Sequence, residues 1–311
     1  MQLFRDLEAL PASLRRGAVS IGNFDGVHRG HARIAERLIA KARAAGGAAV
    51  IFTFDPHPVR ILRPDHAPPP LTWTDRKAEL LSRLGVDAMI AYPTDEALLA
   101  LEPEVFFERI VRECLEARAM VEGPNFFFGH NRRGDIDLLH QLTAGAGIEL
   151  EVVEPLVVDG DYVSSSRVRK LIESGRVEEA ARLSTEPYRI RGMVVHGAGR
   201  GVKLGFPTAN VDGIDTLLPA MGVYAGRVMA GGELHPAAIN IGPNPTFSEQ
   251  IPKVEVHLLE WHEPLYGQVV EVDILARLRD IQRFDGVEAL QQQLARDIVQ
   301  VRQTVAAWPS K

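Results

Sequence analysis

Residues 18–54 carry a pattern that few folds can accommodate: an apolar run, a glycine-rich turn, a helix and a second apolar run. The runs at 18–21 and 48–54 are typical of buried parallel strands, and Ile34, Leu38 and Ile39 give the segment 33–44 between them one apolar helical face. Such a β-α-β unit belongs to a parallel sheet, where ligands bind at the carboxyl edge. The turns that follow the two runs would open at that edge.

The turn after the first run has the features of an anion-binding turn. Gly22 and Gly26 allow close backbone approach, and a helix starting near Gly30 points free N–H groups and its positive dipole end at the turn. If the helix starts at His28, the i,i+3 spacing brings His28 and His31 to one face. Two imidazoles could then hold one phosphate chain. Two surface histidines, or half of a metal site, are the alternatives.

Strand and helix patterns alternate as far as residue 183, with strands expected at 88–92, 119–123 and 148–153 and helices at 74–84, 103–117 and 137–144. This alternation predicts an α/β domain over residues 1–184, with a doubly wound parallel sheet. Short strands then follow one another without long helices, at 189–195, 222–229, 237–241, 254–260 and 269–275. They predict a small antiparallel β-barrel or sandwich over residues 185–311. A helix ends it, with an apolar stripe at Val287, Leu290, Leu294, Ile298 and Val301.

The composition and the net charge of the chain favour some classes of protein and argue against others. A chain of 311 residues with 46% hydrophobic and 24% charged residues suits two globular domains. The net charge of −6 argues against broad nucleic-acid binding, and residues 1–16 lack a signal or membrane-spanning pattern. Cys114 is the only cysteine, which suits a reducing cytoplasm and, with no H-E-x-x-H or C-x-x-C pattern, disfavours a metal centre at the histidines.

Two further loops of the first domain carry polar groups. Residues 123–135 place three phenylalanines beside a basic, glycine-bounded loop, which reads as a core plug or as a pocket for a planar ring. At 164–170 three serines are followed by Arg167, Arg169 and Lys170 at the start of a helix. The pattern is typical of a capped, solvent-exposed helix. It also suits a polyphosphate site, because cations near a helix N-terminus are unfavourable until an anion binds.

The histidine turn together with the S-S-S-R-x-R sequence at 164–169 resembles the nucleotidylyltransferase superfamily, in which two such motifs hold ATP from opposite sides. In the second half, P-T-A-N at 207–210 and V-E-V-H-L at 254–258 resemble riboflavin kinases. The order of these motifs, from about residue 18 to the C-terminal helix, resembles the bifunctional riboflavin kinase/FMN adenylyltransferase family, the bacterial FAD synthetases. Phe127 and Ser166 depart from the residues usual there, which are a basic or polar residue and threonine.

The resemblance implies two reactions. The terminal ribityl hydroxyl of riboflavin attacks the γ-phosphorus of ATP in the barrel to give FMN. The FMN phosphate then attacks the α-phosphorus of a second ATP in the first domain, which gives FAD and pyrophosphate. The implied partners are these small molecules, with Mg²⁺ as cofactor, no nucleic acid or membrane, and at most a weak homo-oligomer.

The resemblance also assigns residues in the first domain. Asn125 is expected on the flavin side, and His28 and His31 are expected to stabilise the transferred phosphoryl group. The expected ATP contacts are Gly22, Asn23, Phe24, Asp25, Gly26, His28, His31, Ser164, Ser165 and Arg167.

For the second domain, the side chains themselves indicate chemistry. The hydroxyl of Thr208 and the amide oxygen of Asn210 are suitable Mg²⁺ ligands, and the resemblance adds Gly199 to them as ATP contacts. A period of two places Glu255 opposite the apolar face of its strand, where its carboxylate could act as general base. The alternative is a turn with Asx-type hydrogen bonds and a solvent-facing strand residue.

Two other functions remain open from the sequence. The first is an adenylyltransferase whose barrel only senses flavin, although such a barrel would be expected to lose Glu255 or Thr208. The second is a protein that senses ATP without chemistry. The histidine turn and the cationic helix start argue against it.

Overall fold

The computed structural model describes residues 1–8, 10–197, 199–243 and 253–308. It divides into two compact units, Met1–Pro68 with Trp73–Ser165 and Pro69–Thr72 with Ser166–Lys311. This division lies closer to the N-terminus than the boundary predicted at 184/185, which remains a prediction about where the two activities separate. No helix in the described part of the chain is long and apolar enough to cross a membrane.

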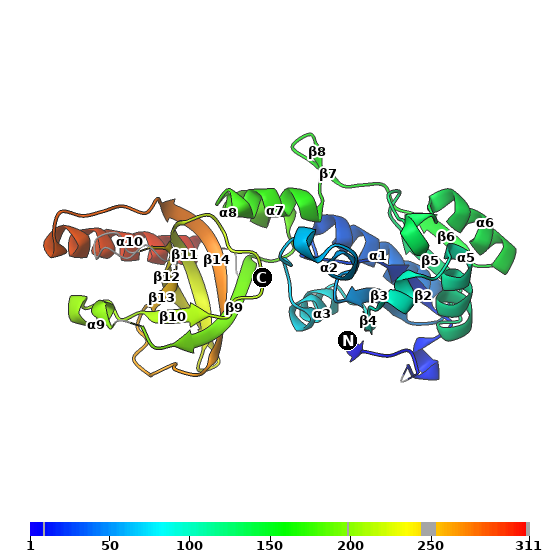
Figure 1. The fold of residues 1–311 in the computed structure, drawn as a ribbon, viewed down its shortest axis with the longest axis horizontal. Helices are drawn as coiled ribbons and strands as arrows, with labels where there is room; N and C mark the ends of the chain where they lie inside the picture. The colour runs from blue at the N-terminus through cyan, green and yellow to red at the C-terminus, as the bar shows by residue number, and fades with distance from the viewer. Residues whose placement is uncertain (9, 198, 244–252, 309–311) are drawn as a thin grey trace. The chain divides into compact units, whose positions relative to one another are not determined.

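The described residues of the first unit form a six-stranded sheet in the order β1-β4-β3-β2-β5-β6 (Figure 1), and every neighbouring pair is parallel. The strands are β1 (Gln2–Phe4), β2 (Ala18–Ile21), β3 (Ala49–Asp55), β4 (Ala88–Pro93), β5 (Ala119–Glu122) and β6 (Glu149–Val152). The predicted parallel sheet is confirmed. β1 was not predicted, because three residues are too few to show a period.

Helices connect these strands. They are η1 (Ala12–Leu14), α1 (Arg29–Ala44), α2 (Pro58–Leu62), η2 (Pro64–His66), α3 (Thr74–Arg83), α4 (Glu96–Leu99), α5 (Pro103–Phe106), η3 (Phe107–Cys114), η4 (His130–Arg132) and α6 (Ile136–Ala146). The helix predicted at 103–117 is a short α-helix that continues as the π-helix η3. A small hairpin, β7 (Val157–Val158) and β8 (Asp161–Tyr162), precedes α7 (Ser165–Glu173).

Each face of the sheet buries its own apolar cluster. Phe52 and Ile90 pack on one face with Ile110 of η3, and Ile51 and Met89 pack on the other face with residues of α1. Both faces are therefore covered, which explains why the strands read as continuous apolar runs without polar alternation.

The strand order reverses at β2. The chain continues from β2 to β3 on one side, and later returns to add β5 on the other side. The turns that leave β2 and β5 therefore flank the topological switch point, where open parallel sheets bind ligands.

The second unit contains a closed antiparallel barrel in the order β10-β13-β12-β11-β14-β9. Its strands are β9 (Tyr188–Val195), β10 (Ala209–Asp212), β11 (Gly222–Ala230), β12 (Glu233–Gly242), β13 (Lys253–Leu258) and β14 (Val269–Arg279). The β-barrel that the family resemblance implies for the second domain is confirmed. β10 was not predicted as a strand, because its four residues include Asn210 and Asp212.

Helices α7, α8 (Val177–Leu183), α9 (Arg200–Leu204) and α10 (Val287–Ala307) complete this unit. α10 packs on the barrel through Val301, which is buried with Ala225 and Leu259, and Ile298 is partly buried against them. The predicted apolar stripe is correct except for its first residue, because Val287 is exposed.

Candidate active sites

The turn after β2 is held in an unusual backbone conformation. Phe24, Gly26 and Val27 all have positive φ, at 46°, 81° and 35°. Left-handed backbone is rare for a β-branched residue, and such strain persists only where packing enforces it. Phe24 and Val27 are buried in the core beneath the turn, and the Phe24 ring lies 4.9 Å from that of His31. The Phe24 side chain therefore packs against the ring of His31. Its expected contact with ATP stays a prediction.

The two histidines meet, although not as the helical spacing predicts. His28 is the extended N-cap residue of α1 and not part of the helix, and its Nδ1 accepts a hydrogen bond from the His31 N–H at 3.3 Å. The rings stack with centroids 3.7 Å apart. Because Nδ1 of His28 accepts, the proton of a neutral His28 ring lies on Nε2, where it can be donated to an anion.

Burial favours the neutral form of both rings. It lowers the pKa of His28 to about 4, against an opposing effect of Asp25. Burial, His28 and Lys77 together hold the pKa of His31 well below its ordinary value. Within the described residues, Nδ1 of His31 is buried without a hydrogen-bond partner. The turn therefore presents neutral imidazoles, whose protonation a bound polyphosphate would favour.

The structure joins the first and third predicted motifs. Ser165, the first residue of α7, donates its hydroxyl to the backbone oxygen of Asp25 at 2.8 Å. Ser164 directly precedes it, so both serines border the histidine turn. Arg167 belongs to the second compact unit, and its contact with ATP remains a prediction.

The sequence interpretation missed two buried charged residues beside this turn. Lys77 of α3 donates from Nζ to the backbone oxygen of Asn23 at 2.6 Å and to Oγ1 of Thr53 at 3.2 Å. It precedes Leu80 and Leu81 by three and four residues, so the helical period already placed it on the buried face.

Glu122, at the end of β5, is the second. The ladder between β2 and β5 stops at Val19 and Met120, and the Glu122 carboxylate then accepts the N–H of Ile21 at 2.7 Å. Burial raises the pKa of Glu122 well above its ordinary value, although the Ile21 N–H opposes this. A lone acidic residue in an apolar strand gave no signal for this contact.

The aromatic residues of the loop after β5 differ in burial. Phe126 and Phe128 stack at 5.3 Å and pack against the core, which agrees with the core-plug interpretation. Phe127 is exposed, with the guanidinium of Arg132 4.6 Å from its ring centre. Asn125, the predicted flavin contact, is exposed in the turn.

In the barrel, the strand register aligns a row of polar residues. Asn210 of β10 lies directly opposite Glu255 of β13, which lies opposite Asn240 of β12. In β13, Val254, Val256 and Leu258 are buried, whereas Glu255 is half-buried, as the period-two pattern predicts. Asn240 was not predicted, although it shares this row.

The loop before β10 is held close to that row. Nδ1 of His257 lies 2.7 Å from the backbone oxygen of Pro207. Because a carbonyl oxygen only accepts, Nδ1 carries the proton and donates it. A Cβ on Gly197 would lie 2.1 Å from Nδ2 of Asn210, and one on Gly201 would lie 3.2 Å from the Thr208 hydroxyl. Gly199 is left-handed, with φ of 66°, at the start of α9.

Thr208 and Asn210 fit a hard cation. Asn210 lies on the face of β10 opposite buried Val211, and Thr208 directly precedes the strand. Their hydroxyl and amide oxygens suit Mg²⁺, which usually keeps few protein ligands and binds through substrate phosphates.

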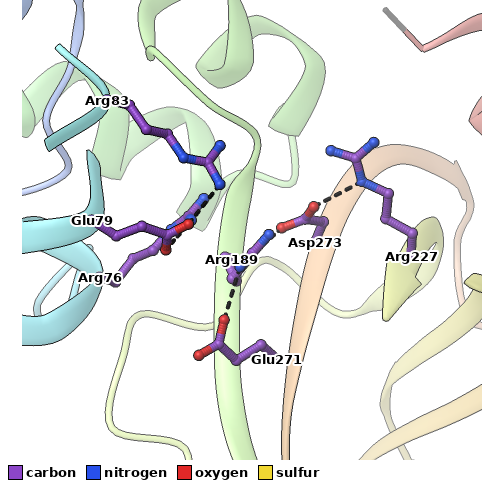
Figure 2. Close-up of polar contacts among 7 residues, drawn as sticks. All are labelled: Arg76, Glu79, Arg83, Arg189, Arg227, Glu271 and Asp273. Atoms are coloured by element: carbon purple, nitrogen blue, oxygen red, sulfur yellow. Dashed lines mark hydrogen bonds and ion pairs between the residues drawn. The ribbon is translucent and has the colours of Figure 1, made fainter. Parts of the chain in front are cut away.

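A buried ionic cluster braces the barrel (Figure 2). Asp273 of β14 accepts from Nε of Arg189 at 2.5 Å and from Nε of Arg227 at 2.8 Å, and Arg189 also bonds Glu271 at 2.8 Å. These contacts tie β9, β11 and β14 together. In the first unit, Glu79 of α3 pairs with Arg76 and Arg83 of the same helix.

The two halves of the chain match different protein families. The FAD synthetase family model matches residues 10–167, and the riboflavin kinase family model matches residues 184–305. The chain is 33% identical over 305 residues to the bifunctional riboflavin kinase/FMN adenylyltransferase of Escherichia coli K12, with 97% of each protein covered. It is 35% identical to the Pseudomonas fluorescens protein of the same name, with 98% of each covered.

A solved structure is also similar over the whole chain. It is described as the crystal structure of a macrolide-efflux protein from Streptococcus pneumoniae. It superposes with a TM-score of 0.86 at 28% identity and covers 99% of both chains.

Proposed function

We propose how two sites act in this chain, which belongs to the bifunctional riboflavin kinase/FMN adenylyltransferase family. The enzyme phosphorylates riboflavin to FMN with ATP, and then joins FMN to the adenylyl group of a second ATP to form FAD and pyrophosphate. Both family matches and the full-length relatives favour flavin chemistry over the efflux activity named for the Streptococcus pneumoniae protein.

In the adenylyltransferase, an oxygen of the FMN phosphate attacks the α-phosphorus of ATP and pyrophosphate leaves. The attacking phosphate is already ionised, so the site needs no base. Nε2–H of His28 and the ring of His31 donate to the oxygens of the transferred group, where charge develops. Ser164, Ser165 and Arg167 hold the pyrophosphate, and Asn125 contacts the flavin side. The stacked pair His28–His31 at the switch point is the observation that carries this proposal.

In the kinase, Glu255 takes the proton of the ribityl hydroxyl as its oxygen attacks the γ-phosphorus. Thr208 and Asn210 would hold Mg²⁺, which neutralises charge on the ATP phosphates when bound. Gly199 lies at the start of α9 and provides a backbone contact for ATP. The register pairing of Asn210 with Glu255 is the observation that supports this assignment, because the residue proposed as base and a residue proposed as cation ligand are cross-strand neighbours.

A cytoplasmic location also remains part of the proposal, and its support is the single cysteine, which suits a reducing compartment.

The first test follows the products over time. The purified protein, given riboflavin, ATP and Mg²⁺, should form FMN and then FAD, resolved by chromatography. A preparation that forms neither product would contradict the proposal.

A second test concerns the boundary between the activities. We expect the fragment 185–311 to phosphorylate riboflavin and to make no FAD. The longer fragment 166–311 keeps α8, whose Glu178 accepts the Arg277 N–H at 3.0 Å. If only the longer fragment folds and is active, the boundary lies at 165 and the helices belong to the kinase.

A further inference from the structure

Lys77 is a buried cation that neither reaction uses. It lies on α3 with a side chain almost fully enclosed, and both contacts of its Nζ are to neutral oxygens, those of Asn23 and Thr53. Burying an ammonium group is costly unless other charges compensate it. Its position beside the histidine turn therefore requires a reason.

The first reason is mechanical. Asn23 opens the turn that contains Phe24, Gly26 and Val27, all at positive φ, and ends at His28. The Asn23 carbonyl oxygen accepts from Nζ of Lys77 at 2.6 Å and from the Thr53 hydroxyl at 3.1 Å, and the shorter bond comes from Lys77. A strained turn relaxes unless its ends are held, so the position of His28 depends on this anchor.

The second reason is electrostatic. The charged groups that act on Lys77 are Asp25 and Asp55, which favour its ammonium form against the effect of burial. Asp55 in turn contacts Arg5 and Thr74. For His31, burial, the neighbouring His28 and Lys77 all oppose protonation. Lys77 thus lies in contact with the turn that is proposed to bind phosphate.

We propose that Lys77 is a positioning residue of the adenylyltransferase: its Nζ anchors the histidine turn at the Asn23 carbonyl and sets the electrostatic environment of His31 beside the place where the triphosphate binds. Lys77 acts through Asn23 and His31 and does not touch the reacting phosphorus. This inference rests on the proposed roles of His28 and His31.

The test is Lys77→Met in the full-length protein, which keeps length and apolar volume but removes charge and donor. Lys41→Met is the matched control, because Lys41 lies on α1 of the same unit and pairs with Glu149 and Glu151. Thr53→Val is a second comparison, because it removes the hydroxyl that accepts from Lys77 and donates to the Asn23 oxygen at 3.1 Å, but leaves the bond from Lys77 to Asn23 and the charge. FAD formation from added FMN, FMN formation from riboflavin, and pyrophosphate binding are measured for each variant.

Proton NMR titration of the His31 ring gives a readout that a merely structural lysine would not change. In Lys77→Met we expect the titration midpoint of His31 to rise, pyrophosphate binding to weaken, and FAD formation to fall on the order of tenfold or more, since small displacements of catalytic groups have effects of this size. Lys41→Met and Thr53→Val should keep the wild-type midpoint, and FMN formation should not change.

An unchanged His31 midpoint in a folded Lys77→Met protein would overturn the inference, as would equal loss of FAD formation in Lys41→Met. If Lys77→Met does not fold, Lys77→Gln, which keeps a donor without charge, is judged by the same midpoint. Failure of the wild-type protein to form FAD from FMN would instead contradict the proposed function itself.

Discussion

The two sites of this enzyme are built in different ways. In the first, polar groups are enclosed by packing: His28, Lys77 and Glu122 are buried, and each has a shifted pKa. In the second, Asn210 and Glu255 are half-buried on one face of the barrel strands, and the register of the ladder brings them together.

This difference matches the chemistry. Adenylyl transfer from an ionised phosphate needs donors in a dry environment, where hydrogen bonds to developing charge are strong. Phosphorylation of an alcohol needs a carboxylate that can accept a proton and lose it again. Packing therefore serves the first site, whereas a partly solvated strand face serves the second.

Glu255→Gln is expected to change the ratio of kinase to adenylyltransferase activity the most. The amide keeps size and hydrogen bonding but cannot accept the hydroxyl proton, and loss of general-base catalysis costs roughly 10² to 10⁴ in rate. Riboflavin phosphorylation should fall by this factor, with little change in the KM for ATP. Adenylylation of added FMN should continue. Kinase turnover within a few-fold of wild type would refute the base assignment.

His31→Ala is the reciprocal change in the first unit. Removal of one donor to a developing oxyanion costs on the order of 10² to 10³ in rate, so FAD formation from FMN should fall by that amount and FMN should accumulate. Single-turnover assays with added FMN measure the effect directly. His31 would be only a structural residue if a folded variant kept wild-type FAD formation.

A pair of glycine substitutions compares how tightly each site is packed. Gly197→Ala places a methyl 2.1 Å from Nδ2 of Asn210, and Gly30→Ala places one 3.0 Å from Cε1 of His28. We expect the first to lower kinase activity on the order of tenfold, and the second to lower only FAD formation, by a few-fold. Steady-state rates of both reactions show whether each change stays within its own unit. Equal loss of both activities in either variant would contradict independent sites.

Acid should affect the stability of the first unit through its histidines. The pKa of His28 is about 4 in the folded state and ordinarily 6.5, so between these values the unfolded chain binds more protons. The free energy of unfolding should therefore fall as the pH drops from 6.5 to 4, by on the order of 3 kcal/mol for this group. Glu122 has the opposite sign, because its folded pKa is raised.

The contribution of His28 is isolated by comparing wild type with His28→Gln. Urea unfolding is followed through Trp73, in variants without the tryptophans of the second unit. The variant should be less sensitive to acid than wild type between pH 6.5 and 4. A pH dependence of unfolding identical to that of wild type would show that His28 is not neutral in the folded protein.

Sequence patterns predicted most of the scaffold for physical reasons that can be named. Continuous apolar runs revealed the parallel strands, and the alternation in β13 placed Glu255 correctly. The end of strand–helix alternation indicated an antiparallel barrel or sandwich, and the family resemblance favoured the barrel. β10 was hidden, because its pairing with β13 and β9 forms only in three dimensions.

The sites were predicted less completely. The closeness of His28 and His31 was expected from helical spacing, whereas the structure achieves it through an N-cap hydrogen bond. Lys77 could have been found from its place on the apolar face of α3. Glu122 could not, because its role depends on where the ladder between β2 and β5 stops.

The buried carboxyl group of Glu122 also affects the electrostatic potential at the edge of the sheet where the substrates of the first unit are proposed to bind. Both substrates of adenylyl transfer, FMN and ATP, are anions, and the chain carries a net charge of −6. An ionised carboxylate at the end of β5 would repel them at the edge where they meet. Burial raises the pKa of Glu122 and so disfavours its negative form there, and the side chain joins β5 to β2 by accepting the N–H of Ile21 at 2.7 Å. The charge that ATP meets at this edge then depends on the local balance between Lys77 and Asp25, and less on the overall acidity of the protein.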